Sequence, residues 1–132
     1  GTQDGNRCGN ALVLIASFVI LGCAALLGSI LAILHLRSAR PVWAFGGLHG
    51  LLGLSGLGCL SATLGGPPRG LGFGTATFGM ISAGLIALAA LVGGGILMQR
   101  LRKRRLEGGL IGIHATLAVS GFVVLAAYLF VG

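Results

Sequence analysis

Charged residues are the scarcest class in this 132-residue chain, at 8% of the total. Only two of them are acidic, Asp4 and Glu107, against nine lysines and arginines. A soluble domain carries roughly 25% charged residues, so this chain has too few to cover a globular surface in water. Hydrophobic residues make up 55% of the sequence and its mean hydropathy is +1.02. These values indicate a protein whose surroundings are a lipid bilayer.

The few acids and cysteines exclude several functions. Asp4 and Glu107 supply no path of acidic side chains across a membrane, which argues against a pump or ion-coupled transporter. Cys8, Cys23 and Cys59 share no metal-type spacing, and an odd number gives no disulfide framework. We expect Cys23 and Cys59 to pack as small apolar residues and Cys8 to be a free thiol outside the membrane. No hydrolase, kinase or nucleotide-binding motif is present, so any enzyme role requires partner subunits.

Four long apolar segments dominate the rest of the chain, at about residues 10–36, 42–64, 73–98 and 109–131. A helix needs ~20 apolar residues to cross a bilayer core, so each segment predicts one spanning helix. The fold class is therefore an all-α membrane protein, a four-helix transmembrane bundle forming one domain over residues 1–132. Residues 1–9 are polar and glycine-rich and predict an extended tail, and residues 65–70 predict a turn.

The basic residues predict the orientation of these helices. Seven of the nine follow the first and third segments: Arg37, Arg40, Arg100, Arg102, Lys103, Arg104 and Arg105. The positive-inside rule then puts these two loops in the cytoplasm and both termini outside, in what we expect to be a bacterial cytoplasmic membrane. A net charge of +7 would suggest nucleic acid for a soluble protein, but charge in short membrane loops indicates topology, and no nucleic acid is expected.

A ten-residue pattern occurs twice, as GLHGLLGLSG at 47–56 and GIHATLAVSG at 112–121. The chain holds only three histidines, and two of them, His49 and His114, occupy the same place in this pattern. At the same offset Ser17 falls on Ser82, and Arg37 and Arg40 fall on Arg102 and Arg105. The sequence predicts two copies of one helical hairpin, in residues 10–66 and 73–131, related by an axis along the membrane normal. Chance similarity in a low-complexity sequence is the alternative.

An ionisable residue inside a membrane span indicates function by default. At ~1.5 Å per residue, His49 and His114 both lie on the order of 10–13 Å inside the cytoplasmic boundary. Residues at i−3, i+4 and i+7 share the face of each histidine. These are small for the most part: Gly46, Gly53 and Gly56 around His49, and Ile111, Ala118 and Gly121 around His114. Such a face permits close helix packing or the entry of a flat macrocycle.

Two neutral imidazoles at one depth can ligate a haem iron from both sides. The haem propionates could then pair with basic residues at the cytoplasmic edge, namely Arg37, Arg40, Arg102 and Arg105. In this layout the chain resembles the small four-helix transmembrane b-type cytochromes, which pass electrons to or from quinones. The resemblance implies one haem b with His49 and His114 as its iron ligands. The small residues Gly53, Gly56, Ala118 and Gly121 would line the site.

Other readings of the histidine pair stay open. Each imidazole could form a hydrogen bond to a neighbouring helix worth about 1 kcal/mol, or the pair could bind another metal or relay protons. Two nitrogens alone make a poor zinc site. His35, at the headgroup level, is expected to reach water, with a bond to a propionate or quinone carbonyl as the alternative.

The expected function is an electron-transfer subunit of a larger respiratory or photosynthetic complex, with a quinone as a candidate partner. The alternative is a cofactor-free accessory subunit that packs against other membrane subunits through its glycine and alanine faces.

Overall fold

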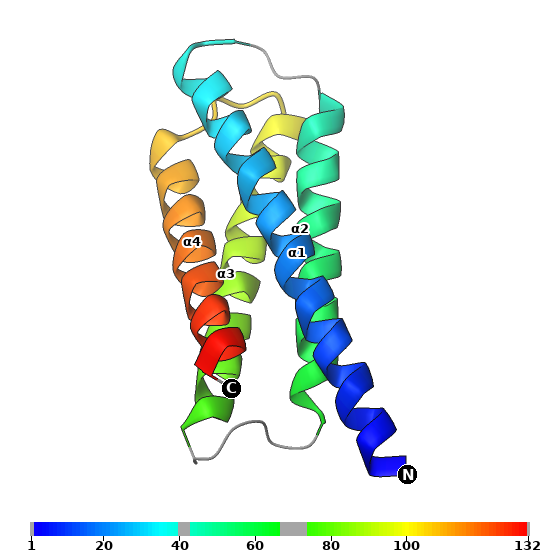
Figure 1. Ribbon diagram of the computed structural model, residues 1–132. Helices are drawn as coiled ribbons and strands as arrows, with labels where there is room; N and C mark the ends of the chain where they lie inside the picture. The colour runs from blue at the N-terminus through cyan, green and yellow to red at the C-terminus, as the bar shows by residue number, and fades with distance from the viewer. Residues whose placement is uncertain (1, 40–42, 67–73, 132) are drawn as a thin grey trace.

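The structure, a computed structural model, describes residues 2–39, 43–66 and 74–131. Within these ranges the chain forms four helices and no strand (Figure 1): α1 (Thr2–Leu36), α2 (Trp43–Leu64), α3 (Thr75–Leu101) and α4 (Gly108–Val131). All four are long and apolar enough to cross a membrane. The predicted all-helical membrane fold is confirmed, and it belongs to the class of integral membrane proteins.

The helix ends lie within two residues of the predicted segments except at the start of α1 and the end of α3. Helix α1 begins at Thr2, so an extended tail was the wrong prediction for residues 2–9. This stretch has no proline to stop a helix, and Asp4 lies in the first turn, where a negative charge is favourable. Helix α3 continues to Leu101, three residues further than predicted. Arg40 and most of the predicted turn at 65–70 lie outside the described residues.

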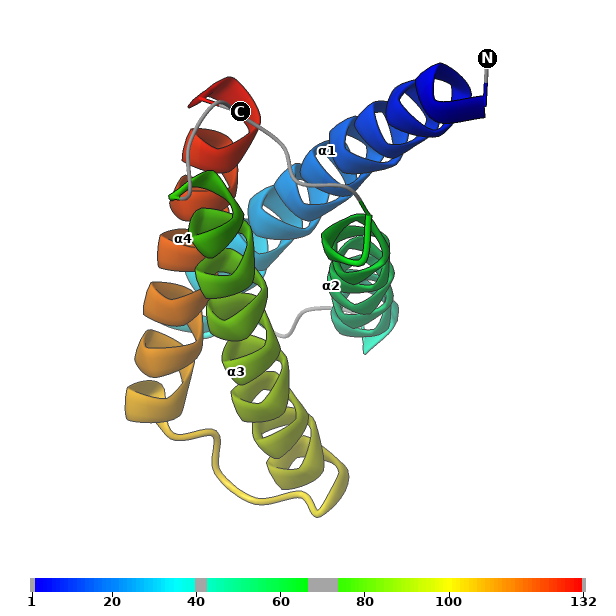
Figure 2. The ribbon, with the colours of Figure 1, turned by 90° about the horizontal axis from the view of Figure 1, so that it is seen from below.

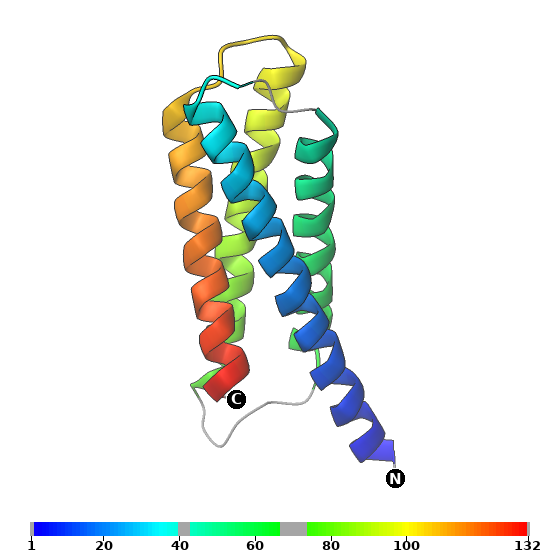
Figure 3. The same ribbon diagram turned by 45° about the horizontal axis from the view of Figure 1, so that its top comes forward.

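The helices pack in a ring, each against the helices before and after it, and α1 also packs against α4. The largest interfaces are α1 with α2 and α3 with α4, the two hairpins, while α2 and α4 face each other across the bundle. Both termini lie at one end of the bundle, and α1 and α3 finish at the other (Figures 1 and 3). Seen from below, the first turns of α1 extend away from the other three helices (Figure 2).

Large apolar side chains cover the outer surface of the bundle. Leu36, Leu91 and Phe130 are 82%, 73% and 79% exposed, whereas the hydroxyl residues Ser17 and Ser82 are fully buried. This distribution is the reverse of that in a water-soluble domain and suits a lipid environment. Cys23 is exposed on the outer face of α1, so the expectation that it packs as a small apolar residue was wrong, whereas Cys59 is partly buried.

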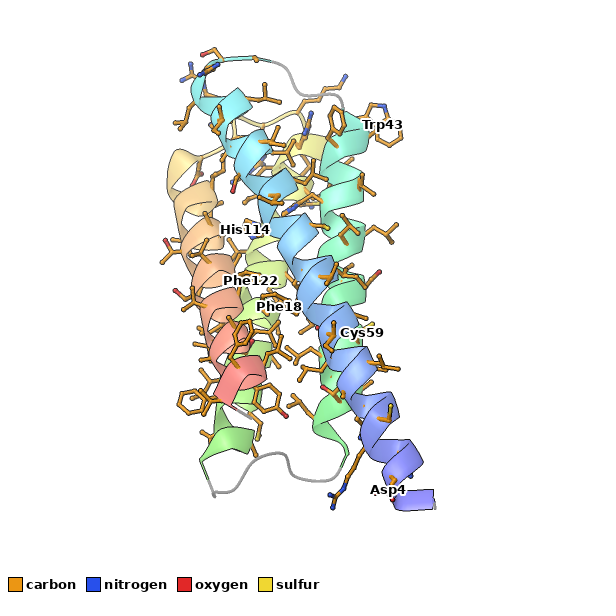
Figure 4. All side chains as sticks on the ribbon, in the orientation of Figure 1. Asp4, Phe18, Trp43, Cys59, His114 and Phe122 are labelled. Carbon is orange, nitrogen blue, oxygen red and sulfur yellow. The ribbon has the colours of Figure 1, made fainter. Side chains whose placement is uncertain are left out.

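The interior changes character along the bundle axis. Large side chains fill the half nearer the termini, where Leu14, Leu60 and Leu125 are fully buried. The stacked rings of Phe18 and Phe122, with centroids 4.9 Å apart, border this core on its inner side (Figure 4). Towards the ends of α1 and α3, buried Leu21 and Ile86 are followed one turn later by the small buried residues Ala24 and Ala89. The histidines lie in this second half.

Candidate functional site

His49 and His114 occupy the same depth in the bundle. Each is the seventh residue of its helix, α2 or α4, which places it ~9 Å from the start of that helix. Both side chains are half-buried, and His114 lies above Phe122 and Phe18 in Figure 4, towards the end where α1 and α3 finish. The matched depth predicted from the sequence is therefore present in the structure.

A backbone carbonyl of the partner helix holds each imidazole. The His49 Nδ1–H donates to the carbonyl oxygen of Ala24 on α1, at 2.9 Å. The His114 Nδ1–H donates to the carbonyl oxygen of Ala89 on α3, at 2.8 Å. In both cases the carbonyl lies 25 residues earlier in the chain. Because a carbonyl oxygen only accepts hydrogen bonds, the proton of each neutral ring sits on Nδ1 and leaves Nε2 with a bare lone pair.

These two Nε2 atoms meet across the bundle, 3.4 Å apart. The rings are nearly perpendicular, at 79°, with centroids 5.7 Å apart. The pair joins α2 to α4, two helices that share no backbone interface of their own. Two bare lone pairs that face each other repel, so a proton or another positive charge shared by the two nitrogens would stabilise this arrangement.

A glycine on the partner helix makes room for each ring. A Cβ atom at Gly28 of α1 would lie 2.8 Å from His49 Cε1, and one at Gly93 of α3 would lie 3.0 Å from His114 Cε1. Both distances are shorter than a normal van der Waals contact between carbon atoms. The glycines therefore allow the imidazoles to lie against the helix that accepts their hydrogen bonds.

The predicted small residues beside the histidines have two different roles. A Cβ at Gly53 would meet no atom within 4 Å, so open space lies beside the His49 face of α2. Gly56 and Gly121 are buried in close helix contacts instead, and a Cβ on either would collide with Leu21 or Ile86. Ala118 is half-buried.

The carbonyl oxygens of Gly56 and Gly121 also accept hydrogen bonds between helices. The Ser17 hydroxyl donates to Gly56 at 2.9 Å, and the Ser82 hydroxyl donates to Gly121 at 2.8 Å. Both serines are fully buried, so these bonds satisfy groups that could not reach water. These two hydrogen bonds join α1 to α2 and α3 to α4.

The predicted arginines lie at the same end of the bundle as the histidines. Arg37, Arg102 and Arg105 are exposed there, and Arg40 lies outside the described residues. Arg100 comes closer to α2: its guanidinium nitrogen Nη1 is 3.6 Å from the Cβ position of Gly46, one turn from His49 on the same face.

The residues predicted for the site do not include Ala24, Ala89, Gly28 or Gly93. The sequence carries one signal for all four, since AALLG at 24–28 and AALVG at 89–93 recur at the offset that relates the two histidines. Such a match indicates a repeat but no function, because a backbone carbonyl and a missing side chain carry the role.

The residues present fit a haem in their donor chemistry. Two Nε2 lone pairs face each other, each ring is oriented by a hydrogen bond at Nδ1, and Gly53 leaves space alongside. Two metal–nitrogen bonds of about 2 Å in one line would span ~4 Å, so the two nitrogens, now 3.4 Å apart, would have to separate for an iron to lie between them.

The fold and the paired imidazoles define a small helical membrane protein in which two histidines meet between the helices. No known protein family, curated protein or solved structure matches the chain.

Proposed function

We propose that this chain is an integral membrane electron-transfer subunit that holds one haem b between His49 and His114. The observation that carries the proposal is the pair of Nε2 atoms facing each other at 3.4 Å while both Nδ1 atoms are bonded to backbone carbonyls. Iron-ligating histidines need this tautomer, with the metal-facing nitrogen unprotonated. A haem bound here would supply one-electron redox chemistry within the membrane.

The chain's own residues have three roles in this proposal. The Ala24 and Ala89 carbonyls hold the rings in one orientation and make each Nε2 a better donor. Gly28 and Gly93 leave room for the two imidazole rings, and Gly53 leaves open space on the His49 face of α2. Arg37, Arg40, Arg102 and Arg105 pair with the propionates, and Arg100, which reaches α2 at Gly46, is a further candidate. His35 is a candidate hydrogen-bond donor to a propionate or quinone.

The proposal includes a duplicated hairpin, residues 10–66 and 73–131, with its axis along the membrane normal. Three pairs of contacts recur at the offset that separates the histidines: the two histidine–alanine bonds, the two serine–glycine bonds and the two glycine–imidazole contacts. We further propose that both termini lie outside a bacterial cytoplasmic membrane, because Arg37 and the 100–105 basic cluster occupy the opposite end. Other subunits and a quinone are the proposed partners.

A reduced-minus-oxidised absorption spectrum of the purified protein tests the haem. We expect a b-type spectrum with one haem per chain, lost in His49→Ala and in His114→Ala. Ser61→Ala is the control and should keep the spectrum, because Ser61 is exposed and its hydroxyl bonds to the Leu57 carbonyl of its own helix.

The same measurement separates the rival function. A folded, monodisperse protein with no haem after expression in haem-replete cells would overturn the proposal. That result would favour a cofactor-free accessory subunit, in which the histidines serve only as interhelical hydrogen-bond donors worth about 1 kcal/mol each.

A further inference from the structure

Basic side chains gather at the end of the bundle where α1 and α3 finish. The chain has two acidic residues, and only Glu107 lies at this end, because Asp4 is in the first turn of α1. One carboxylate cannot balance the cations, so a large positive charge remains. We call this group the basic end; its described members are all exposed and comprise Arg37, Arg100, Arg102, Lys103, Arg104 and Arg105.

The helix dipoles do not offset this charge. Helices α1 and α3 finish at the basic end with negative poles of about half a charge each, whereas α2 and α4 begin there with positive poles of the same size (Figure 1). These four contributions cancel. Glu107 immediately precedes α4, where the positive pole favours a carboxylate. The net positive charge of the basic end is therefore available to an anion from outside the chain.

Apolar side chains lie directly beside the cations. Leu36 precedes Arg37, Leu101 precedes Arg102, and both leucines are exposed. Trp43, at the start of α2, is 78% exposed at the same end of the bundle (Figure 4). In membrane proteins, exposed tryptophan is typical of the interface between lipid headgroups and hydrocarbon. The basic end therefore offers charge and apolar surface together, which suits an amphiphilic anion.

We propose that the basic end binds the headgroups of anionic phospholipids through Lys103 and Arg104. The backbone of both residues is fixed to the end of α3, since the Lys103 amide donates to the Arg100 carbonyl at 3.1 Å and the Arg104 amide to the Gln99 carbonyl at 2.9 Å. Each basic residue near an anionic bilayer surface strengthens the interaction about fivefold. Neither Lys103 nor Arg104 belongs to the proposed haem site, so this inference does not rest on the haem.

The apolar neighbours favour a lipid over an acidic protein. A soluble acidic partner would match the charge but would leave Leu36, Leu101 and Trp43 against a polar surface. A phospholipid satisfies both requirements, because its phosphate faces the cations while its acyl chains cover the leucines. The guanidinium of Arg104 can bind phosphate through two parallel hydrogen bonds, and the ammonium of Lys103 can bind it as a point charge.

Trp43 reports on the lipid at this end. It is the only tryptophan of the chain, and Gly46 lies about one turn after it in α2. The Cβ position of Gly46 is 3.6 Å from the Arg100 guanidinium of α3. Trp43 therefore lies about one helical turn from a contact with the basic end.

Fluorescence quenching in vesicles tests the inference on the full-length protein. The protein is reconstituted in phosphatidylcholine vesicles with rising fractions of brominated phosphatidylglycerol or, in a second series, brominated phosphatidylcholine. The ratio of the two quenching constants gives the preference for the anionic lipid, and any quenching within the protein cancels. We expect a preference of at least about fivefold at low salt. It should decrease as salt shortens the Debye length from about 10 Å at 0.1 M to 3 Å at 1 M.

Charge variants locate the preference. The double variant Lys103→Gln and Arg104→Gln should reduce it at least about threefold. Arg7→Gln is the control, because it removes a positive charge near the start of α1, at the opposite end of the bundle, and should leave the preference at Trp43 unchanged. The haem content should match that of the parent chain in both variants, so a failure of the haem proposal and a failure of this one are distinguishable.

The parent chain and the variants each supply a result that decides the inference. Equal quenching of the folded parent by the two lipids would overturn it and leave an acidic protein as the partner of the basic end. A preference that salt does not weaken, or that the double variant retains as fully as Arg7→Gln, would also overturn it. Loss of the preference on adding inorganic phosphate at constant ionic strength would mean a site for free anions instead of lipid.

Discussion

At the scale of single residues, the site depends as much on two glycines as on the two histidines. Each imidazole packs against a glycine of the neighbouring helix, Gly28 or Gly93. Ala24 and Ala89, one turn earlier on the same helices, accept the Nδ1 hydrogen bonds through their backbone oxygens. A glycine that packs against an imidazole cannot be told from any other membrane glycine by composition, and this chain has 26. Only the position of the imidazole ring in the structure distinguishes Gly28 and Gly93 from the other glycines.

Gly93→Ala tests this role. The new methyl group would lie 3.0 Å from His114 Cε1, so the ring must shift by a few tenths of an ångström, which distorts its bond to the Ala89 carbonyl. We expect a loss of about 1–3 kcal/mol in the free energy of unfolding and reduced haem content. Gly28→Ala should behave alike, because its methyl group meets His49 at 2.8 Å.

Neighbouring glycines supply the controls for these two variants. A Cβ at Gly94 or Gly50 would meet no atom within 4 Å, so Gly94→Ala and Gly50→Ala should be neutral or slightly stabilising. Thermal unfolding in detergent and the haem-to-protein ratio are the measurements. If all four alanine variants behave alike, the glycines have no specific role at the site.

At the scale of elements, the helices α1 and α3 end in the same way. The amide of Ala39 bonds to the Leu34 carbonyl and that of Ser38 to the His35 carbonyl; Arg104 with Gln99 and Lys103 with Arg100 repeat the pattern. This is the Schellman motif, in which one residue adopts a left-handed conformation, usually as glycine. Here those residues are Ser38 and Lys103, with φ of 55° and 53°.

Replacing these two residues with glycine should stabilise the protein. A residue with a Cβ atom pays roughly 1–2 kcal/mol in the left-handed region, which glycine avoids. We expect Ser38→Gly and Lys103→Gly each to raise the free energy of unfolding by about 1 kcal/mol, measured by thermal or denaturant unfolding in detergent.

The adjacent residues are the matched controls. Ala39 and Arg104 do not have positive φ, so Ala39→Gly and Arg104→Gly add only backbone freedom and should be neutral or destabilising. Equal effects at all four positions would mean that the left-handed strain does not limit stability.

The element scale also shows where sequence reasoning succeeded and where it did not. Four spans were predictable because apolar length is a property of each segment alone. The start of α1 at Thr2 was not, since residues 2–9 are mostly polar and include two glycines, a composition typical of a tail. Gly56 and Gly121 were assigned to a cofactor face, yet they pack against Leu21 and Ile86, contacts that depend on which helix lies opposite.

At the scale of the whole molecule, the basic residues gather at one end of an apolar bundle. Arg37 and the cluster from Arg100 to Arg105 lie where α1 and α3 finish, opposite the termini. The proposed orientation puts this end in the cytoplasm, because the Lys and Arg bias of short loops sets membrane topology.

Cysteine labelling tests the orientation in intact cells. With Cys23 and Cys59 changed to serine, the exposed thiol of Cys8 near the N-terminus should react with a membrane-impermeant maleimide. With all native cysteines removed, Lys103→Cys should react only after the membrane is permeabilised. The opposite pattern would reverse the proposed topology.

The sequence by itself determined the class of protein, the four spans, and two histidines at one depth. These follow from hydropathy, helix rise and residue spacing, which are properties along one chain. Only the tertiary structure decided that α1 and α3 present carbonyls to the rings, that both Nδ1 atoms carry the proton, and that the two Nε2 atoms meet at 3.4 Å. Those facts depend on how closely helices approach one another and on their rotation, and no single helix contains that information.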